Sequence, residues 1–247
     1  MTEQARLNQV IVIDTETGGL NPETDPLLVV AAVRLTDPED CFFRAIRSYR
    51  RGSPDAERVH GLTHQWLQEH GEPEAAVLRA FAAWTGSETS WIAAGCHVAF
   101  DCAFIDAAAR RCGVGARMPH RRIDVQSLAW RADMRGEIKL PGKNGRASFS
   151  LDSILAAIGR ERQGGVHHAL DDAKLTRDAI EELLYLPQCR RCNSTGYMRN
   201  TGSDGTVWTD PCNDCDGTGL VQRFAVDLRT GRDPLPAIET TTETTGC

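Results

Sequence analysis

The sequence lacks any long apolar run. No hydrophobic stretch in its 247 residues approaches the roughly 18 residues that a membrane-spanning helix needs. The first nine residues are polar and contain no signal-peptide core. These absences argue against a membrane protein, and we expect the chain to be cytoplasmic.

The sequence also lacks an excess of positive charge. Its 28 Lys and Arg residues against 34 Asp and Glu give a formal charge of −6, which argues against a protein that coats nucleic acid non-specifically. Between Arg110 and Arg146, however, ten basic residues face three acidic ones. This segment either contacts phosphates or forms a solvated helix face and loop.

Apolar patterning along the first 186 residues predicts an α/β domain. Runs of β-branched and apolar residues predict strands at 10–13, 27–35, 41–48, 91–96 and 122–125. Helical periodicity predicts helices near 57–60, 64–70, 74–85, 101–112, 151–158 and 168–186, with Ser150 as an N-cap. Three strands joined by short links, followed by alternating helices and strands, predict a mixed five-stranded sheet flanked by helices.

Two carboxylates stand at the end of the first predicted strand, in Asp14-Thr15-Glu16. Because strand residues two apart point to the same side, Asp14 and Glu16 can converge on one point. Neighbouring carboxylates raise each other's pKa unless a cation lies between them, and a hard divalent cation prefers oxygen ligands. The pair therefore indicates a metal site or a solvent-facing strand end, and this stretch alone does not decide between them.

Two more acidic positions lie where this layout can bring them to Asp14. Asp101 follows the fourth predicted strand at the start of a helix, and Asp172 lies in the last predicted helix. His167 precedes Asp172 with four residues between them, about one helical turn. One of these two groups could bind a metal while the other moves a proton.

The order of these motifs resembles the DEDDh family of 3′-to-5′ exonucleases, which includes polymerase proofreading subunits and ribonuclease T. The resemblance runs from about Val10 to Leu184 and includes the Val-His-Gly-Leu-Thr turn at 59–63. The segment 14–25 looks particularly like the ribonuclease T branch. Any one motif is weak evidence, but several in register are specific.

The resemblance implies a ribonuclease H-like fold and a two-metal hydrolysis that releases nucleoside 5′-monophosphates from the 3′ end of a single strand. Asp14, Glu16 and Asp172 would hold one Mg²⁺ or Mn²⁺, and Asp14 would bridge to a second ion near Asp101. His167 would take the proton from the attacking water. The residues expected to position the terminal nucleotide are Thr17, Gly18, Leu20, His60 and His97.

Two departures from the family pattern bear on these assignments. His97 stands where the family usually has Asn, so its contact is open, although histidine can still donate a hydrogen bond. His168 and Asp171 duplicate the residue types beside them. We choose His167 and Asp172 because that pair keeps the family's four-residue gap, and we interpret the other two as helix-surface residues.

Four cysteines near the carboxy terminus form two C-x-x-C pairs: Cys189, Cys192, Cys212 and Cys215. This spacing fits a four-thiolate structural zinc site. A segment of about thirty residues is too short to build a hydrophobic core and needs such a metal cross-link to fold. The second pair lies in a C-x-x-C-x-G-x-G motif that resembles the zinc repeats of DnaJ chaperones. A redox dithiol pair or free thiols are the alternatives, and the module's role, in binding polypeptide or nucleic acid, is open.

We therefore predict an exonuclease domain at 1–186, a zinc module at 187–222 and a disordered tail at 223–247. The expected cofactors are two Mg²⁺ or Mn²⁺ ions and one structural Zn²⁺. The expected partners are 3′ ends of single-stranded DNA or RNA, which the sequence does not distinguish, and a protein bound through the zinc module. The competing hypothesis is a non-catalytic adaptor that links nucleic acid or a polymerase to such a partner.

Overall fold

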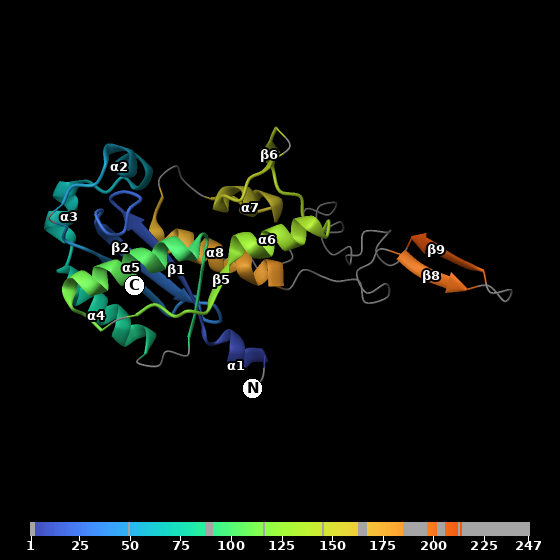
Figure 1. The fold of residues 1–247 in the computed structure, drawn as a ribbon, viewed down its shortest axis with the longest axis horizontal. Coiled ribbons are helices and arrows are strands. Elements are labelled where there is room, and N and C mark those ends of the chain that lie inside the picture. Colours follow the sequence, from blue (N-terminus) through green and yellow to red (C-terminus); the bar gives the residue numbers. More distant parts are fainter. Residues whose placement is uncertain are drawn as a thin grey trace.

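The computed structural model describes residues 3–48, 50–86, 91–115, 117–144, 146–162, 167–184, 197–201, 206–211 and 213. Its centre is a mixed five-stranded sheet in the order β3-β2-β1-β4-β5 (Figure 1). The strands are β1 (Val10–Thr17), β2 (Leu27–Arg34), β3 (Cys41–Ala45), β4 (Ile92–Gly95) and β5 (Arg122–Asp124). β2 is antiparallel to β1 and β3, whereas β4 is parallel to β1 and β5. The predicted mixed sheet flanked by helices is confirmed.

The central strand β1 is buried on both faces because its apolar residues alternate between two cores. Ile11 and Ile13 pack with α4 (Glu74–Thr85) and α5 (Val98–Cys112). Val10 and Val12 pack with α6 (Val125–Met134), α7 (Leu151–Ala157) and α8 (Ala169–Leu184). Helices on both faces explain why this strand reads as a continuous apolar run.

The helix boundaries follow local signals closely. α3 (His64–His70) and α4 have the predicted bounds, α2 (Pro54–His60) begins at a proline after the Ser53 cap, and Ser150 caps α7 as expected. α5 begins at Val98, three residues earlier than predicted. A short α1 (Glu3–Leu7) and a hairpin of β6 (Gly142–Lys143) with β7 (Arg146–Ala147), inside the predicted loop, were not foreseen.

Near the carboxy terminus, β8 (Tyr197–Thr201) pairs antiparallel with β9 (Val207–Pro211). The four cysteines predicted to bind zinc, and the predicted tail at 223–247, lie outside the described residues. Within the described part of the chain, no helix has the length and apolar character required to span a membrane.

Candidate active site

Asp14 and Glu16 lie inside β1 and not at its end. The strand continues to Thr17, pairing Asp14 with Ala31 and Glu16 with Val29 on β2. The predicted end of the strand at Ile13 is therefore wrong, because pairing with a buried apolar neighbour keeps the polar residues extended. Their even spacing places both side chains on the β1 face that packs towards α8. Glu16 is only 8% exposed.

Asp101 reaches this strand from the other face of the sheet. It lies in the first turn of α5 and is 4% exposed. The Thr15 hydroxyl donates a hydrogen bond of 2.7 Å to its Oδ1 atom. Because Thr15 sits between Asp14 and Glu16 in β1, this bond fixes the third carboxylate beside the first two.

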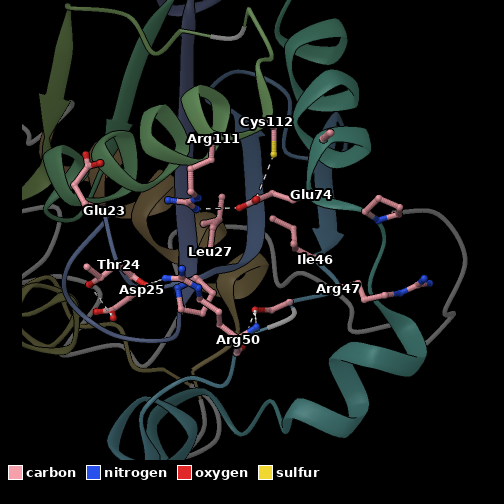
Figure 2. Close-up of a pocket in the computed structure, with 14 residues that line it drawn as sticks. Glu23, Thr24, Asp25, Leu27, Ile46, Arg47, Arg50, Glu74, Arg111 and Cys112 are labelled. Atoms are coloured by element: carbon pink, nitrogen blue, oxygen red, sulfur yellow. Dashed lines mark hydrogen bonds and ion pairs between the residues drawn. The ribbon is translucent and has the colours of Figure 1, made fainter.

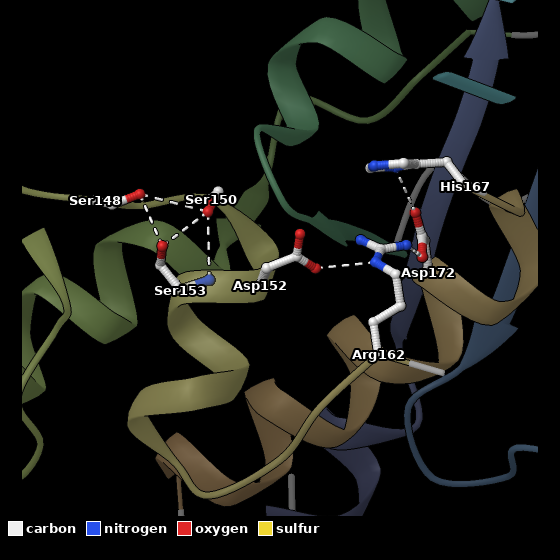
Figure 3. A network of polar contacts seen from close by, with 7 residues as sticks. All are labelled: Ser148, Ser150, Asp152, Ser153, Arg162, His167 and Asp172. Carbon is white, nitrogen blue, oxygen red and sulfur yellow. Dashed lines mark hydrogen bonds and ion pairs between the residues drawn. The ribbon is translucent and has the colours of Figure 1, made fainter. Parts of the chain in front are cut away.

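Asp172 and His167 complete the cluster at the start of α8 (Figure 3). Asp172 is 3% exposed, and its Oδ2 atom lies 3.1 Å from Nδ1 of His167. His168 instead pairs with the exposed Asp171 at 3.4 Å and stacks on Phe43. The structure therefore brings His167, and not His168, to Asp172, as the four-residue gap predicted.

Burial dominates the electrostatics of this cluster. It is the largest cause that raises the pKa of Glu16 to about 8 and the pKa of Asp101 to about 7. Burial also raises the pKa of Asp14 well above its ordinary value, with further repulsion from Asp101, Glu16 and Asp172. The pKa of Asp172 is raised too, because burial outweighs the opposing effects of Arg162 and His167. Four carboxyl groups therefore share one end of the sheet, and burial raises the pKa of each of them.

The donor set fits a divalent cation, although the side chains do not surround one. Oε1 of Glu16 is buried and has no hydrogen-bond partner. Such an orphaned oxygen beside other repelling carboxylates is a suitable ligand for Mg²⁺ or Mn²⁺. Within the described residues, however, no three His, Cys, Asp or Glu side chains are grouped closely enough to hold an ion. The carboxylates would have to close around a metal.

The residues predicted to position substrate have different surroundings. Thr17 donates to the Gly19 carbonyl at 2.7 Å. Gly18 donates its N–H to the Pro26 carbonyl, and its own carbonyl accepts from Ser53. A Cβ at Gly18 would lie 2.6 Å from the Pro26 side chain, so only glycine fits there.

The other predicted contacts differ in exposure. Leu20 is 84% exposed, whereas His60 is 5% exposed, with its Nδ1 accepting from Leu62 N–H and its Nε2 lacking a partner. Burial lowers the pKa of His60. α2 adjoins His167, because the His167 N–H donates to the Val59 carbonyl at 3.1 Å. His97 is exposed and stacks on Phe100, so its ring is not held against the carboxylates.

Two residues of the cluster were missed in the sequence. Thr15 holds Asp101, and Arg162 contacts both Asp152 and Asp172. The alternation of β1 could have drawn attention to Thr15. Arg162 follows Gly159 in a loop without periodicity, so no local pattern could have marked it.

A pocket of about 390 Å³ lies elsewhere on the domain (Figure 2). Its wall includes segments 23–27 and 46–48 and Arg50, together with the start of α4 and the end of α5. Arg111 there pairs with Glu74 at 3.0 Å, and the Cys112 thiol donates to the same carboxylate. None of the predicted site residues lines this pocket, so it is separate from the carboxylate cluster.

Ion pairs also neutralise part of the basic segment between Arg110 and Arg146. Arg110 pairs with Glu23, and Arg131 and Arg135 both pair with Glu137. These contacts favour a solvated, ion-paired surface for those arginines over a continuous phosphate-binding stripe.

Comparison with known proteins gives concordant results. The RNase T family model, described as an exonuclease, matches residues 11–179. The DNA polymerase III PolC-type of Thermotoga petrophila is 30% identical over 170 residues, covering 67% of this chain and 11% of that protein. The chain thus spans about a tenth of this curated relative.

Solved structures show the same fold. Escherichia coli exonuclease I in complex with a dA16 oligonucleotide matches with a TM-score of 0.60 and 24% identity, over 71% of this chain and 40% of that one. The complex of the same enzyme with a 5cy-dA13 oligonucleotide matches with a TM-score of 0.58 and 23% identity, over the same shares.

Proposed function

The chain belongs to the RNase T exonuclease family, and from this membership we propose that it is a metal-dependent 3′-to-5′ exonuclease that acts on single-stranded nucleic acid. The observation that carries the proposal is the set of four carboxylates, three of them buried, with His167 at one end of the sheet. A fold that only presented nucleic acid to a partner would have no need to keep these groups buried together. The oligonucleotides in the matched exonuclease I structures support a single-stranded substrate.

Asp14, Glu16 and Asp172 would hold one Mg²⁺ or Mn²⁺, and Asp14 and Asp101 a second. When bound, two such ions supply Lewis-acid stabilisation of the attacking water and the leaving 3′ oxygen. Thr15 orients Asp101 through its 2.7 Å hydrogen bond. The strand β1 keeps Asp14 and Glu16 in place because both residues are paired with β2, while β4 pairs with the preceding residues Val10 to Val12.

His167 would act as the general base. Its Nδ1 faces Asp172 at 3.1 Å, and its side chain is 43% exposed, so Nε2 is available to a water molecule. Contact with a carboxylate orients the ring and favours the tautomer in which Nδ1 carries the proton. A positioned base of this kind contributes roughly 10²- to 10⁴-fold to the rate. The product would be a nucleoside 5′-monophosphate.

The test is digestion of a 5′-labelled single strand in Mg²⁺ or Mn²⁺. We expect labelled products that shorten stepwise from the 3′ end, together with free 5′-mononucleotides. Two neighbouring pairs supply matched controls: Asp172→Asn and His167→Gln should lower the rate by at least about 10²-fold, whereas Asp171→Asn and His168→Gln should not. Equal losses in both pairs, or no activity in purified wild type, would refute the proposal. Matched DNA and RNA strands then identify the preferred substrate.

We also propose that Cys189, Cys192, Cys212 and Cys215 bind one structural Zn²⁺. The described hairpin supports this, because Tyr197 on β8 pairs with Pro211 on β9. One C-x-x-C pair therefore precedes β8 and the other follows β9, so both adjoin in sequence the end of the hairpin at which Tyr197 pairs with Pro211. We expect close to one zinc per purified chain, lost in Cys212→Ser; a folded wild type that contains no zinc would contradict the site.

A further inference from the structure

Both carboxylate oxygens of Asp172 already have partners (Figure 3). Oδ2 faces His167, and Oδ1 accepts from Nη1 of Arg162. The same guanidinium donates from Nε to Oδ1 of Asp152 on α7 at 2.9 Å. Arg162 therefore bridges α7 and α8 through two carboxylates, which the planar fork of arginine suits better than the point charge of lysine.

Arg162 is placed to act on the cluster as a whole. Its side chain is 11% exposed, so water screens its charge only in part. The positive charge of Arg162 opposes the rise in the pKa of Asp14, Glu16 and Asp172. Among the described residues, it is the one arginine or lysine whose ion pair reaches any of the four clustered carboxylates.

We propose that Arg162 is the internal counter-ion of the carboxylate cluster in the metal-free protein and that it competes with a divalent cation for Asp172. The inference rests on the proposed function, in which Asp172 is a metal ligand. A carboxylate oxygen bonded to a guanidinium is not free to coordinate a metal. A guanidinium left in place would also repel an incoming cation a few ångströms away. Metal loading then requires that Arg162 leave Asp172, and Arg162 sets how tightly the metal binds.

The chain offers a matched control two residues away. Arg160 pairs with Asp178 at 3.2 Å and with none of the four site carboxylates. Substituting Arg160 changes the net charge of the protein as much as substituting Arg162, but leaves the bridge to Asp172 intact. A difference between the two variants therefore reports the bridge and not the overall charge.

The test is titration of the metal-free full-length protein with Mn²⁺ at pH 8, followed calorimetrically without substrate. We expect Arg162→Gln to bind Mn²⁺ about tenfold more tightly than wild type, which corresponds to about 1.4 kcal/mol. The Mn²⁺ affinity of Arg162→Lys should lie between those of wild type and Arg162→Gln, because lysine keeps the positive charge but not the planar guanidinium. The Mn²⁺ affinity of Arg160→Gln should equal that of wild type. In EDTA, Arg162→Gln should melt below wild type, and saturating Mn²⁺ should close that gap.

The outcomes separate this inference from the function on which it rests. Equal or weaker Mn²⁺ binding in Arg162→Gln, with wild-type binding that Asp172→Asn abolishes, overturns the competition and leaves the exonuclease proposal standing. Absence of Mn²⁺ binding in both wild type and Arg162→Gln overturns both. If Arg162→Gln is unfolded with and without Mn²⁺, Arg162→Lys decides: tighter binding than wild type supports the competition, and unchanged binding refutes it.

Discussion

Replacing one carboxylate of the candidate active site, in Glu16→Gln, should stabilise the metal-free protein. Burial is the largest cause that raises the pKa of Glu16 from 4.5 to about 8. A carboxyl group whose pKa is higher in the folded than in the unfolded state stabilises the fold at any pH below its pKa in the unfolded state. This contribution is lost as the pH rises from that pKa through the pKa in the folded state. Each pH unit in that window costs the metal-free protein about 1.4 kcal/mol. The loss is small at pH 5 and reaches about 5 kcal/mol by pH 9.

Glutamine has a similar shape and does not titrate, so the variant escapes this loss. We expect Glu16→Gln to match wild type within about 1 kcal/mol at pH 5 and to exceed it by about 3 to 5 kcal/mol at pH 9. The measurement is urea denaturation in EDTA at pH 5, 7 and 9, followed by tryptophan fluorescence. Glu39→Gln, at an exposed turn, is the control and should show no pH-dependent gain.

Bound metal should reduce or reverse the difference in stability between Glu16→Gln and wild type. A ligand at 100 times its dissociation constant stabilises the fold by about 2.7 kcal/mol, and the variant lacks one carboxylate with which to bind it. With saturating Mn²⁺ the advantage of Glu16→Gln should therefore shrink or change sign. A variant that is destabilised equally at every pH would show that Glu16 serves the packing of β1, and the electrostatic reasoning would fail.

Three further substitutions test individual contacts. Thr15→Val removes the 2.7 Å hydrogen bond to Asp101 and should lower the free energy of unfolding by about 1 to 3 kcal/mol at pH 8. The loss should be smaller at pH 5, because the bond favours the ionised carboxylate and the pKa of Asp101 is about 7. His97→Gly should stabilise the fold by about 0.5 to 1 kcal/mol in urea denaturation, because His97 has a φ of 64°, where L side chains are strained; a loss would contradict this. Ser150→Ala should lower stability by about 1 kcal/mol by removing the α7 N-cap, whereas Ser127→Ala on the exposed face of α6 should stay within about 0.5 kcal/mol.

The fold was predictable where local pattern and burial agree. Val10 to Ile13 is apolar at every position because helices cover both faces of β1. Helices α3 and α4 begin directly after Thr63 and Pro73, residues that favour helix starts. The choice of His167 over His168 came from the resemblance to the family's four-residue gap; in the structure His167 contacts Asp172, and its N–H donates to the Val59 carbonyl.

The errors arise where tertiary contacts override local preference. Asp14 and Glu16 disfavour a strand, yet β2 holds them in β1 through pairing with Ala31 and Val29. α5 begins early because His97 adopts a left-handed backbone conformation immediately before Val98. Asparagine tolerates that conformation well, which gives a backbone reason for the family's usual residue at this position. The bridge made by Arg162 depends on how two helices are brought together, so no short stretch encodes it.

These errors share a location and a cause. Ionised carboxylates are unfavourable in a buried site, and burial accordingly raises the pKa of Glu16 to about 8 and that of Asp101 to about 7. β1 can hold them because it is the central strand: its apolar residues are buried on both faces, β4 pairs with Val10 to Val12, and β2 pairs with it as far as Thr17. A strand at the edge of the sheet could relax by fraying, and the carboxylates would then move into water. Rigidity at the centre keeps the charges close enough for a cation to stabilise them, so the feature that weakens the metal-free protein is the one that prepares it to bind metal.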